Sequence, residues 1–179
     1  MTVDFLFFSR QINAESIFLQ EDESKHCISV LRRQNGDIIK VADGLGHIYE
    51  AQIINAHPKK CEAKIISTQY FEATQPKIHL AIAPTKSMDR IEWVIEKLTE
   101  IGVNEFSFII CDRSERRELK MERVEKIVLS AFKQSKQFWI PKINPPQKLK
   151  DFAKNLPSGQ KFVGYCETGN EEFITKLIN

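Results

Sequence analysis

The sequence lacks both a long apolar run and a strong excess of charge of one sign. Its 179 residues hold 26 Lys plus Arg against 24 Asp plus Glu, a net charge of +2, which is too weak for the whole surface to attract polyanions. The longest apolar runs, such as residues 5–8, are far shorter than the roughly 20 residues of a membrane span. Asp4 stands where a secretory signal would be basic. We therefore expect a cytoplasmic protein in which any nucleic-acid binding comes from local patches.

Several common site motifs are also absent. The four cysteines, Cys27, Cys61, Cys111 and Cys166, form no CxxC pair, so neither a zinc ribbon nor a redox motif is supported, and we expect four buried thiols in a reducing compartment. There is no GxGxxG, P-loop, HExxH or GxSxG segment. Nucleotide hydrolysis, zinc proteolysis and serine-hydrolase chemistry therefore lose their usual sequence support, and no metal site is expected.

The first part of the chain has the pattern of short strands. Hydrophobic residues make up 42% of the sequence and charged residues 28%, which is typical of a folded globular protein. Turn signals at 35–37 and 43–46 separate β-branched or alternating segments, which predicts strands at 3–8, 16–19, 37–42, 47–55 and 61–68. Asp22 or Ser24 can cap one helix with Cys27, Val30 and Leu31 on a single face. A small β-barrel or sandwich is predicted.

After a linker at 72–77 the pattern changes to alternating strands and helices. The spacing predicts strands at 77–83, 105–111 and 162–166, and helices at 87–102 and 121–135. Such alternation indicates a parallel sheet with helices on both faces. Residues 171–178 resemble the start of another helix whose apolar side has no further strand to cover. We infer from this that the chain is a fragment, or that a partner completes its sheet.

Three segments carry clusters of basic residues. Within HCISVLRRQNGD, residues 26–37, Arg32 and Arg33 follow the apolar face of the short helix, where their guanidinium groups can bind phosphates. The alternative is a solvated helix end whose cations interact favourably with the helix dipole. Lys86 and Arg90 lie at the carboxyl end of a predicted strand and in the first turn of the next helix, where open α/β sheets bind ligands. Cations near the first turn of a helix oppose the helix dipole, and this small energetic cost suggests that they hold a bound anion.

The third segment, CDRSERRELK at residues 111–120, also follows a strand. Its basic residues are nearly balanced by acidic ones, so it is weak as a general polyanion patch. Its place on a loop between a strand and a helix is the argument for function. Arg113 and Arg116 are the residues of interest in it.

Together these segments resemble the ribosomal RNA small subunit methyltransferase E family of the SPOUT superfamily. HCISVLRRQNGD is similar to its H-x-x-V-L-R-x-x-x-G-D signature, and KSMDRIEWVIEKLTEIGV followed by DRSERR is similar to its K-G-D-R-x-E-x-x-x-x-K-x-T-E-L-G-V and RS elements. The resemblance implies a PUA-like RNA-binding β-barrel at 1–71 and a SPOUT-type α/β (trefoil-knot) methyltransferase domain at 76–179. It further implies a homodimer that methylates uridine N3 of 16S ribosomal RNA with S-adenosyl-L-methionine.

The sequence departs from the family pattern in two places. Where the family has E-Q-S-x-R, residues 133–137 read KQSKQ, so Lys136 is the candidate substitute for an arginine. The family's G-P-E-G-G and L-R-x-E-T-A segments, which form the knot and most of the cofactor pocket, would lie beyond Asn179. We therefore expect a C-terminally incomplete methyltransferase domain that does not bind the cofactor measurably as this chain alone.

The resemblance assigns roles to individual residues. Arg113 is the candidate catalytic residue, stabilising the deprotonated uracil. The loop of Cys166, Glu167, Thr168 and Gly169 is the candidate cofactor-binding segment. The candidate RNA-binding residues are His26, Arg32, Arg33, Lys86, Arg90 and Arg116. Two other functions stay open: an RNA-binding module without chemistry, and a flavodoxin-like small-molecule enzyme, which leaves the barrel unexplained.

Overall fold

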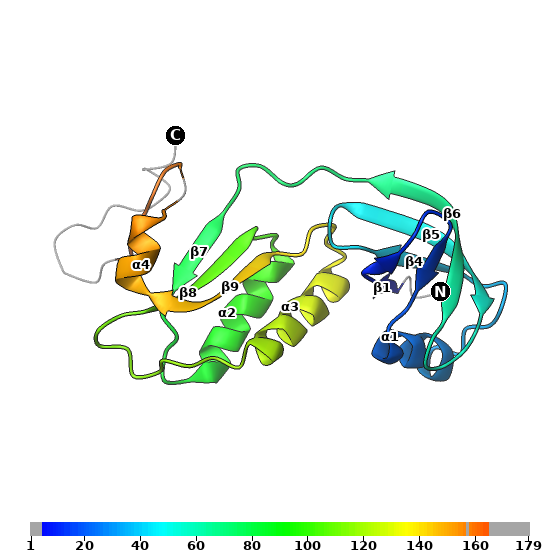
Figure 1. Cartoon of the computed structure of the whole chain (residues 1–179), viewed down its shortest axis with the longest axis horizontal. Helices are drawn as coiled ribbons and strands as arrows, with labels where there is room; N and C mark the ends of the chain where they lie inside the picture. Colours follow the sequence, from blue (N-terminus) through cyan, green and yellow to red (C-terminus); the bar gives the residue numbers. More distant parts are fainter. Residues whose placement is uncertain (1–4, 157, 165–179) are drawn as a thin grey trace.

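A computed structural model describes residues 5–156 and 158–164, in two parts joined by an extended segment (Figure 1). The first part, which we call the barrel, is a curled six-stranded sheet with the order β1-β4-β5-β6-β3-β2, in which only the β1–β4 pair is parallel. Its strands are β1 (Leu6–Phe8), β2 (Gln11–Ile12), β3 (Ser16–Phe18), β4 (Ile38–Ala42), β5 (His47–Asn55) and β6 (Glu62–Tyr70). The strand-rich first part is therefore as predicted, apart from the two-residue β2.

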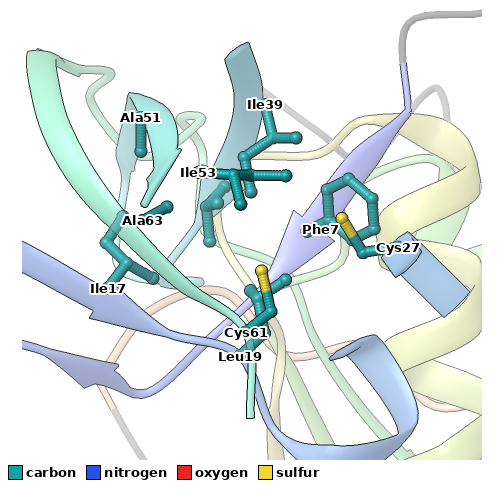
Figure 2. Close-up of a cluster of buried hydrophobic side chains, with 10 residues drawn as sticks. Phe7, Ile17, Leu19, Cys27, Ile39, Ala51, Ile53, Cys61 and Ala63 are labelled. Carbon is teal, nitrogen blue, oxygen red and sulfur yellow. The ribbon is translucent and has the colours of Figure 1, made fainter. Parts of the chain in front are cut away.

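The core of this part lies on the inner face of the sheet. Strand alternation turns Ile39 and Val41 of β4 inward, and the register pairs them with Ala51 and Tyr49 of β5. Figure 2 shows the cluster, which is almost fully shielded from water and contains Phe7, Ile17, Leu19, Cys27, Ile39, Val41, Ala51, Ile53, Cys61 and Ala63. Burial of these side chains stabilises the curled sheet.

The helix of the first part forms as predicted, but its cap and its last turn differ from the prediction. It begins as α1 (Glu21–Lys25) and continues as a π-helical turn, η1 (His26–Val30). Neither Asp22 nor Ser24 caps it, because the N-cap is Gln20 and makes no side-chain hydrogen bond. The Ser24 hydroxyl instead donates to the Leu19 carbonyl at 2.9 Å and accepts from the Cys61 amide at 2.9 Å. It therefore connects the helix, inside the core, to the residue that precedes β6.

The cysteines are only partly as predicted. Cys27 and Cys61 are buried, whereas Cys111 is half-buried and Cys166 lies outside the described residues. The hydrogen bond between the Cys27 and Cys61 thiols raises the pKa of Cys27 and lowers that of Cys61. In this pair the Cys27 thiol is thus the hydrogen-bond donor and the Cys61 sulfur is the acceptor, inside the barrel core.

The second part is a parallel sheet with the order β7-β8-β9. Its elements are β7 (His79–Ile82), α2 (Met88–Glu100), β8 (Glu105–Ile110), α3 (Met121–Ser135), β9 (Lys142–Lys148) and α4 (Leu149–Lys154). Ile91 and Ile95 of α2 and Val124 and Val128 of α3 are buried with residues of β8, including Phe106. The expected helical spacing and the first two strands are confirmed.

The third strand was placed wrongly from the sequence. It is β9, whereas residues 162–164 have no regular secondary structure and residues 165 and 166 lie outside the described range. Pro145 and Pro146 lie within β9, and proline cannot donate to a sheet ladder. The strand tolerates them because it is at the edge of this sheet and because the register shifts between Ser107 and Ile109, opposite the two prolines.

Helices do not cover both faces of the sheet in the described part of the chain. The helices α2 and α3 lie together on one face (Figure 1). On the other face, the short α4 is the one described helix that makes a contact. The Phe152 ring of α4 and the His79 ring of β7 pack edge to face, with their centroids 5.8 Å apart. The predicted helix at 171–178 lies outside the described residues. No described helix is long and apolar enough to cross a membrane.

The two parts meet along α3 and the segment that follows it. Phe132 of α3 is buried against Phe8 and Ala42 of the barrel, and Lys133 donates a hydrogen bond to the buried Glu23. Beyond α3, the Phe138 carbonyl accepts from the Gly46 amide at 3.0 Å. Hydrophobic, ionic and backbone contacts therefore fix the barrel against the α/β part.

Candidate functional site

The loops that follow β7 and β8 form one cationic surface. Lys86, in the first loop, forms an ion pair with Glu115 of the second loop, with Nζ 3.8 Å from Oε2. Arg116 crosses between the loops, where its Nη2 donates to the Lys86 carbonyl at 3.2 Å. The carboxyl ends of parallel strands lie at the same sheet edge, so two loops that are distant in sequence are neighbours here. The structure thus brings together Lys86 and Arg116, two of the predicted RNA-binding residues.

Arg116 is held differently from the other basic residues of this edge. Its side chain is half-buried, and among the described residues its buried Nε has no hydrogen-bond partner. A buried donor without an acceptor is costly. One guanidinium nitrogen, Nη2, therefore holds the loop contact, while the buried Nε remains an unsatisfied donor in the described part of the chain.

The remaining cations of this edge face the solvent. Arg90 in the first turn of α2 is exposed, as are Arg113 and Arg117 in the second loop. Arg117 donates to the Asp112 carbonyl at 3.5 Å, which is at the limit of a hydrogen bond. Exposed guanidinium groups suit phosphates, which they can bind through two parallel hydrogen bonds. The edge can therefore bind a polyanion chain.

A second cationic group lies in the barrel. Arg32 and Arg33 line a recess of about 480 Å³ together with Ile28, Gln34, Asn35 and Ala56. Arg32 has a φ of 54°, an uncommon conformation for a non-glycine residue, and it follows Leu31, the C-cap of the π-helical turn. The Ala56 amide donates to the Asn35 side chain at 2.7 Å, which helps hold the loop in place. The two arginines thus lie at one recess beside the short helix.

His26 lies away from this recess. Its half-buried ring packs edge to face with the Phe5 ring, with centroids 5.5 Å apart, and its centroid lies 6.0 Å from that of the Phe7 ring. The ring is thereby packed among aromatic side chains of the first strand region. The structure does not place His26 beside Arg32 and Arg33 as one phosphate-binding group.

The predicted RNA-binding residues are therefore spread over the molecule. In Figure 1 the carboxyl ends of β7 and β8 lie at the far side of the α/β part from the barrel, while η1 follows α1 at the other end of the long axis. A ligand that touches both groups must be long. A single small molecule cannot bridge them, whereas a nucleic-acid strand can.

Sequence reasoning missed a row of polar side chains across the sheet. The His79 ring and the Ser107 hydroxyl are 2.9 Å apart, and the Asn144 amide donates to Ser107 at 2.9 Å and to Glu105 at 2.6 Å. Lys142 also donates to Glu105, at 2.9 Å. These residues come from three strands, and their pairing follows from the register of β9, which the sequence pattern had not indicated.

Glu105 is the titratable centre of this row. Partial burial acts to raise its pKa, but the hydrogen bonds from Asn144 and Lys142 and the nearby His79 together outweigh that effect and lower it. Glu105 is thus stabilised as a carboxylate by its neighbours on β9 and β7. The row connects the strands and is a structural polar network.

The candidate cofactor segment, Cys166, Glu167, Thr168 and Gly169, lies outside the described residues. S-adenosylmethionine carries a sulfonium and an ammonium against one carboxylate, so it has a net positive charge. The cationic edge formed by Lys86, Arg90, Arg113 and Arg116 therefore fits RNA phosphates better than it fits this cofactor. Among the residues that the structure describes, no group of three or more His, Cys, Asp or Glu is placed to bind a metal ion.

Comparison with known families assigns most of the chain. A family model described as an RNA methyltransferase domain matches residues 72–179, and one described as an RNA methyltransferase PUA domain matches residues 19–66. The ribosomal RNA small subunit methyltransferase E of Synechocystis sp. is 29% identical over 161 residues, which cover 88% of this chain and 52% of that protein. The chain thus spans about half the length of this curated relative.

Solved structures give the same picture of the fold. A probable rRNA methyltransferase from Porphyromonas gingivalis is 40% identical, with a TM-score of 0.72 over 79% of this chain and 60% of that one. A ribosomal RNA small subunit methyltransferase E from Neisseria gonorrhoeae, bound to S-adenosyl methionine, has a TM-score of 0.73 at 24% identity over 86% of this chain and 66% of that one. A PUA-like first part followed by a SPOUT-type α/β part is thus confirmed.

Proposed function

The chain belongs to the RNA methyltransferase domain family, and from this premise we propose that it serves the S-adenosylmethionine-dependent methylation of uridine N3 in 16S ribosomal RNA. The observation that carries the proposal is the joined pair of cationic loops at the carboxyl edge of the sheet, where Arg116 bonds to the Lys86 backbone. In open α/β sheets this edge is where ligands bind. The curated relatives supply the reaction class and the RNA.

Each cation at the edge has a distinct proposed task. Lys86 and Arg90 bind phosphates that flank the target uridine, since both are exposed and separate from the barrel. Arg113, also exposed, stabilises the negative charge that uracil acquires when its N3 proton is removed. Because N3 is used in base pairing, the uridine must be unpaired or turned out of its helix.

The cofactor supplies the methyl group. We assign its binding to Cys166, Glu167, Thr168 and Gly169, on the strength of the family resemblance and of the cofactor bound by the Neisseria relative. The Glu167 carboxylate suits the positive charge of the cofactor, whereas the cations of the described edge do not. Because we expect no measurable binding by this chain alone, the test is isothermal titration of S-adenosylmethionine against the longer protein that carries this chain and against its Glu167→Gln variant, which should bind more weakly.

The barrel serves as the RNA-docking part. Arg32 and Arg33 sit at a recess that also presents amide side chains, which suits contacts to the sugar-phosphate backbone. The helix α1, which precedes this recess in the chain, and the carboxyl ends of β7 and β8 lie in different parts of the molecule (Figure 1), an arrangement that suits an extended RNA substrate. Action as a homodimer in the cytoplasm belongs to the same proposal.

Methyl transfer to RNA tests the function directly. Purified small-subunit RNA and tritiated S-adenosylmethionine are incubated with the protein that carries this chain, and nucleoside analysis identifies the product. We expect 3-methyluridine, and a loss of at least tenfold in Arg113→Gln with Lys126→Gln, an exposed cation of α3, as the matched control. RNA binding without any methylated nucleoside would favour the non-catalytic RNA-binding module instead.

A further inference from the structure

We propose that the recess between the barrel and the end of α3 binds one unpaired nucleotide of the RNA substrate, an inference that rests on the proposed function. The recess has a volume of about 380 Å³, within the range of small-ligand pockets. One wall is the outer face of the curled sheet, including Ser67 and Gln69 of β6. The other wall is the segment after α3, with Lys136 and Phe138.

Aromatic rings form the apolar side of this recess. Phe71 and Phe138 are stacked, with ring centroids 3.8 Å apart and an interplanar angle of 7°, and Phe5 lies at the rim with 38% of its surface exposed. The stacked pair is fixed by its backbone, because the Phe71 amide donates to the Gly46 carbonyl at 2.8 Å and the Gly46 amide donates to Phe138 at 3.0 Å. Preformed aromatic surfaces of this kind bind nucleobases by stacking.

Polar groups also line the recess. The Ser67 hydroxyl donates to Glu50 at 3.3 Å, and the exposed Gln69 amide carries both a donor and an acceptor. These groups suit the hydrogen-bonding edge of a base. Lys136, exposed at the left-handed end of α3 with a φ of 55°, supplies a cation for the phosphate. An apolar peptide side chain would use the rings but leave these polar groups unmatched, so a nucleotide fits better.

The position of the recess supports the same ligand. In Figure 1 the segment after α3 lies at the junction between the barrel and the α/β part. An RNA strand that touches Arg32 in the barrel and Lys86 at the sheet edge has to pass the junction of the two parts. A nucleotide bound there would orient the strand along the molecule.

Photo-crosslinking can locate the nucleotide. Single-stranded RNA containing 5-iodouridine is irradiated with the wild-type protein, and the crosslinked peptides are identified by mass spectrometry. We expect crosslinks at Phe5, Phe71 or Phe138. Crosslinks confined to residues outside this recess would overturn the inference, as would crosslinks that a 1,000-fold excess of uridine monophosphate and competing oligonucleotide fails to reduce.

Binding measurements on variants provide the second test. By fluorescence anisotropy with the same RNA, we expect Phe5→Ala to bind roughly five- to tenfold more weakly, the lower part of the range for a lost stacking contact. Its control is Ile54→Ala, an exposed apolar residue of β5 outside the recess. Lys136→Gln should lower the salt dependence of log K by about 0.7, whereas Lys126→Gln should not.

The outcomes separate this inference from the proposed function. If wild type binds RNA and both recess variants bind as tightly as their controls, the recess has no role in RNA binding although the function stands. If wild type binds no RNA at all, both are wrong. Circular dichroism of each variant shows whether a loss of binding comes from a loss of fold, and a misfolded Phe5→Ala is replaced by Gln69→Ala, which alters only an exposed amide.

Discussion

Lys133 of α3 donates a hydrogen bond to the carboxylate of Glu23 in α1, a residue 110 positions away in the other part of the molecule. The second oxygen of Glu23 accepts from the Phe8 amide at 3.1 Å, and only 7% of Glu23 is exposed. A buried carboxylate needs such partners, because an unpaired buried charge is costly. This contact therefore helps set the angle between the barrel and the α/β part.

Removal of the cation should destabilise the protein. We expect Lys133→Met to lower the free energy of unfolding by about 1–3 kcal/mol, because the Glu23 charge stays buried with one partner fewer. Urea unfolding followed by circular dichroism measures the change. Lys126→Met, on an exposed position of the same helix, is the control and should change stability little. A Glu23→Gln/Lys133→Met double variant should recover part of the loss, and a fully additive loss would contradict the ion-pair explanation.

A second contact between the two parts depends on Gly46. Its φ is 95°, and an added Cβ would lie 2.7 Å from the Phe71 carbonyl and 2.8 Å from the Trp139 ring. Gly36 has a similar φ of 93° but has nothing within 4 Å of such an atom. Comparison of the two glycines therefore separates backbone strain from steric overlap.

We expect Gly36→Ala to cost about 1 kcal/mol of unfolding free energy from the left-handed backbone alone. Gly46→Ala should cost at least about 2 kcal/mol more, since backbone and ring atoms must move apart. Thermal and urea unfolding of the two variants give the difference. Equal losses would show that the junction can adjust around Gly46.

Much of the fold could be predicted from the sequence because its signals are local. The i, i+3, i+4 spacing of Ile91, Val94 and Ile95 predicts α2, and the turn at 43–46 separates β4 from β5. Strand β9 could not be found in this way, because Pro145 and Pro146 resemble a loop and only the edge position makes a strand possible there.

The candidate site could be predicted in its parts and not in its arrangement. Lys86 and Arg116 were each predicted to follow the end of a strand, whereas the hydrogen bond that joins their two loops was not predicted. The separation of Arg32 from this edge depends on how two parts pack, which no local pattern encodes. The aromatic recess at Phe71 and Phe138 was missed for the same reason, since these residues are distant in sequence and meet through Gly46.

The tether between the two cationic loops makes a prediction about local motion. In Arg116→Gln the hydrogen bond to the Lys86 carbonyl is lost, so the loop after β7 should exchange its amide hydrogens faster while global stability changes by less than about 1 kcal/mol. Hydrogen exchange with mass spectrometry measures this. Arg113→Gln, which alters an exposed guanidinium in the loop after β8 that also carries Arg116, should leave exchange unchanged, and equal exchange in all three proteins would contradict the tether.

The polar row of the sheet makes a prediction about pH. The folded-state pKa of Glu105 is lowered from its ordinary value of 4.5, so its ionised form contributes stability that is present above pH 4.5. That contribution is lost as the pH falls through the lower folded-state pKa. Glu105→Gln should therefore be less stable than wild type at pH 6, and the difference should shrink below pH 4.5. Urea unfolding across pH 3–6 tests this, with the exposed Glu125→Gln as the charge-matched control.

Arg32 and Arg33 allow the barrel's part in RNA docking to be measured apart from folding. Both lie at the recess beside the π-helical turn, and the exposed Arg32 has a φ of 54°, so we choose glutamine for Arg33 and asparagine, which tolerates this conformation, for Arg32. Loss of two phosphate contacts should reduce the slope of log K against log salt by about 0.7 per contact for single-stranded RNA. The unfolding free energy should stay nearly constant, because surface changes usually alter it by less than about 0.5 kcal/mol.

The matched control for this last prediction is the pair Lys64→Gln and Lys126→Gln, which removes two exposed charges elsewhere. If the effect came only from net charge, the control would flatten the salt dependence as much as the arginine pair does. If the arginines bind phosphates at their recess, the arginine pair alone should flatten it, because counterion release depends on the cations that meet the RNA. An unchanged slope in the arginine variant would remove the barrel recess from the docking surface.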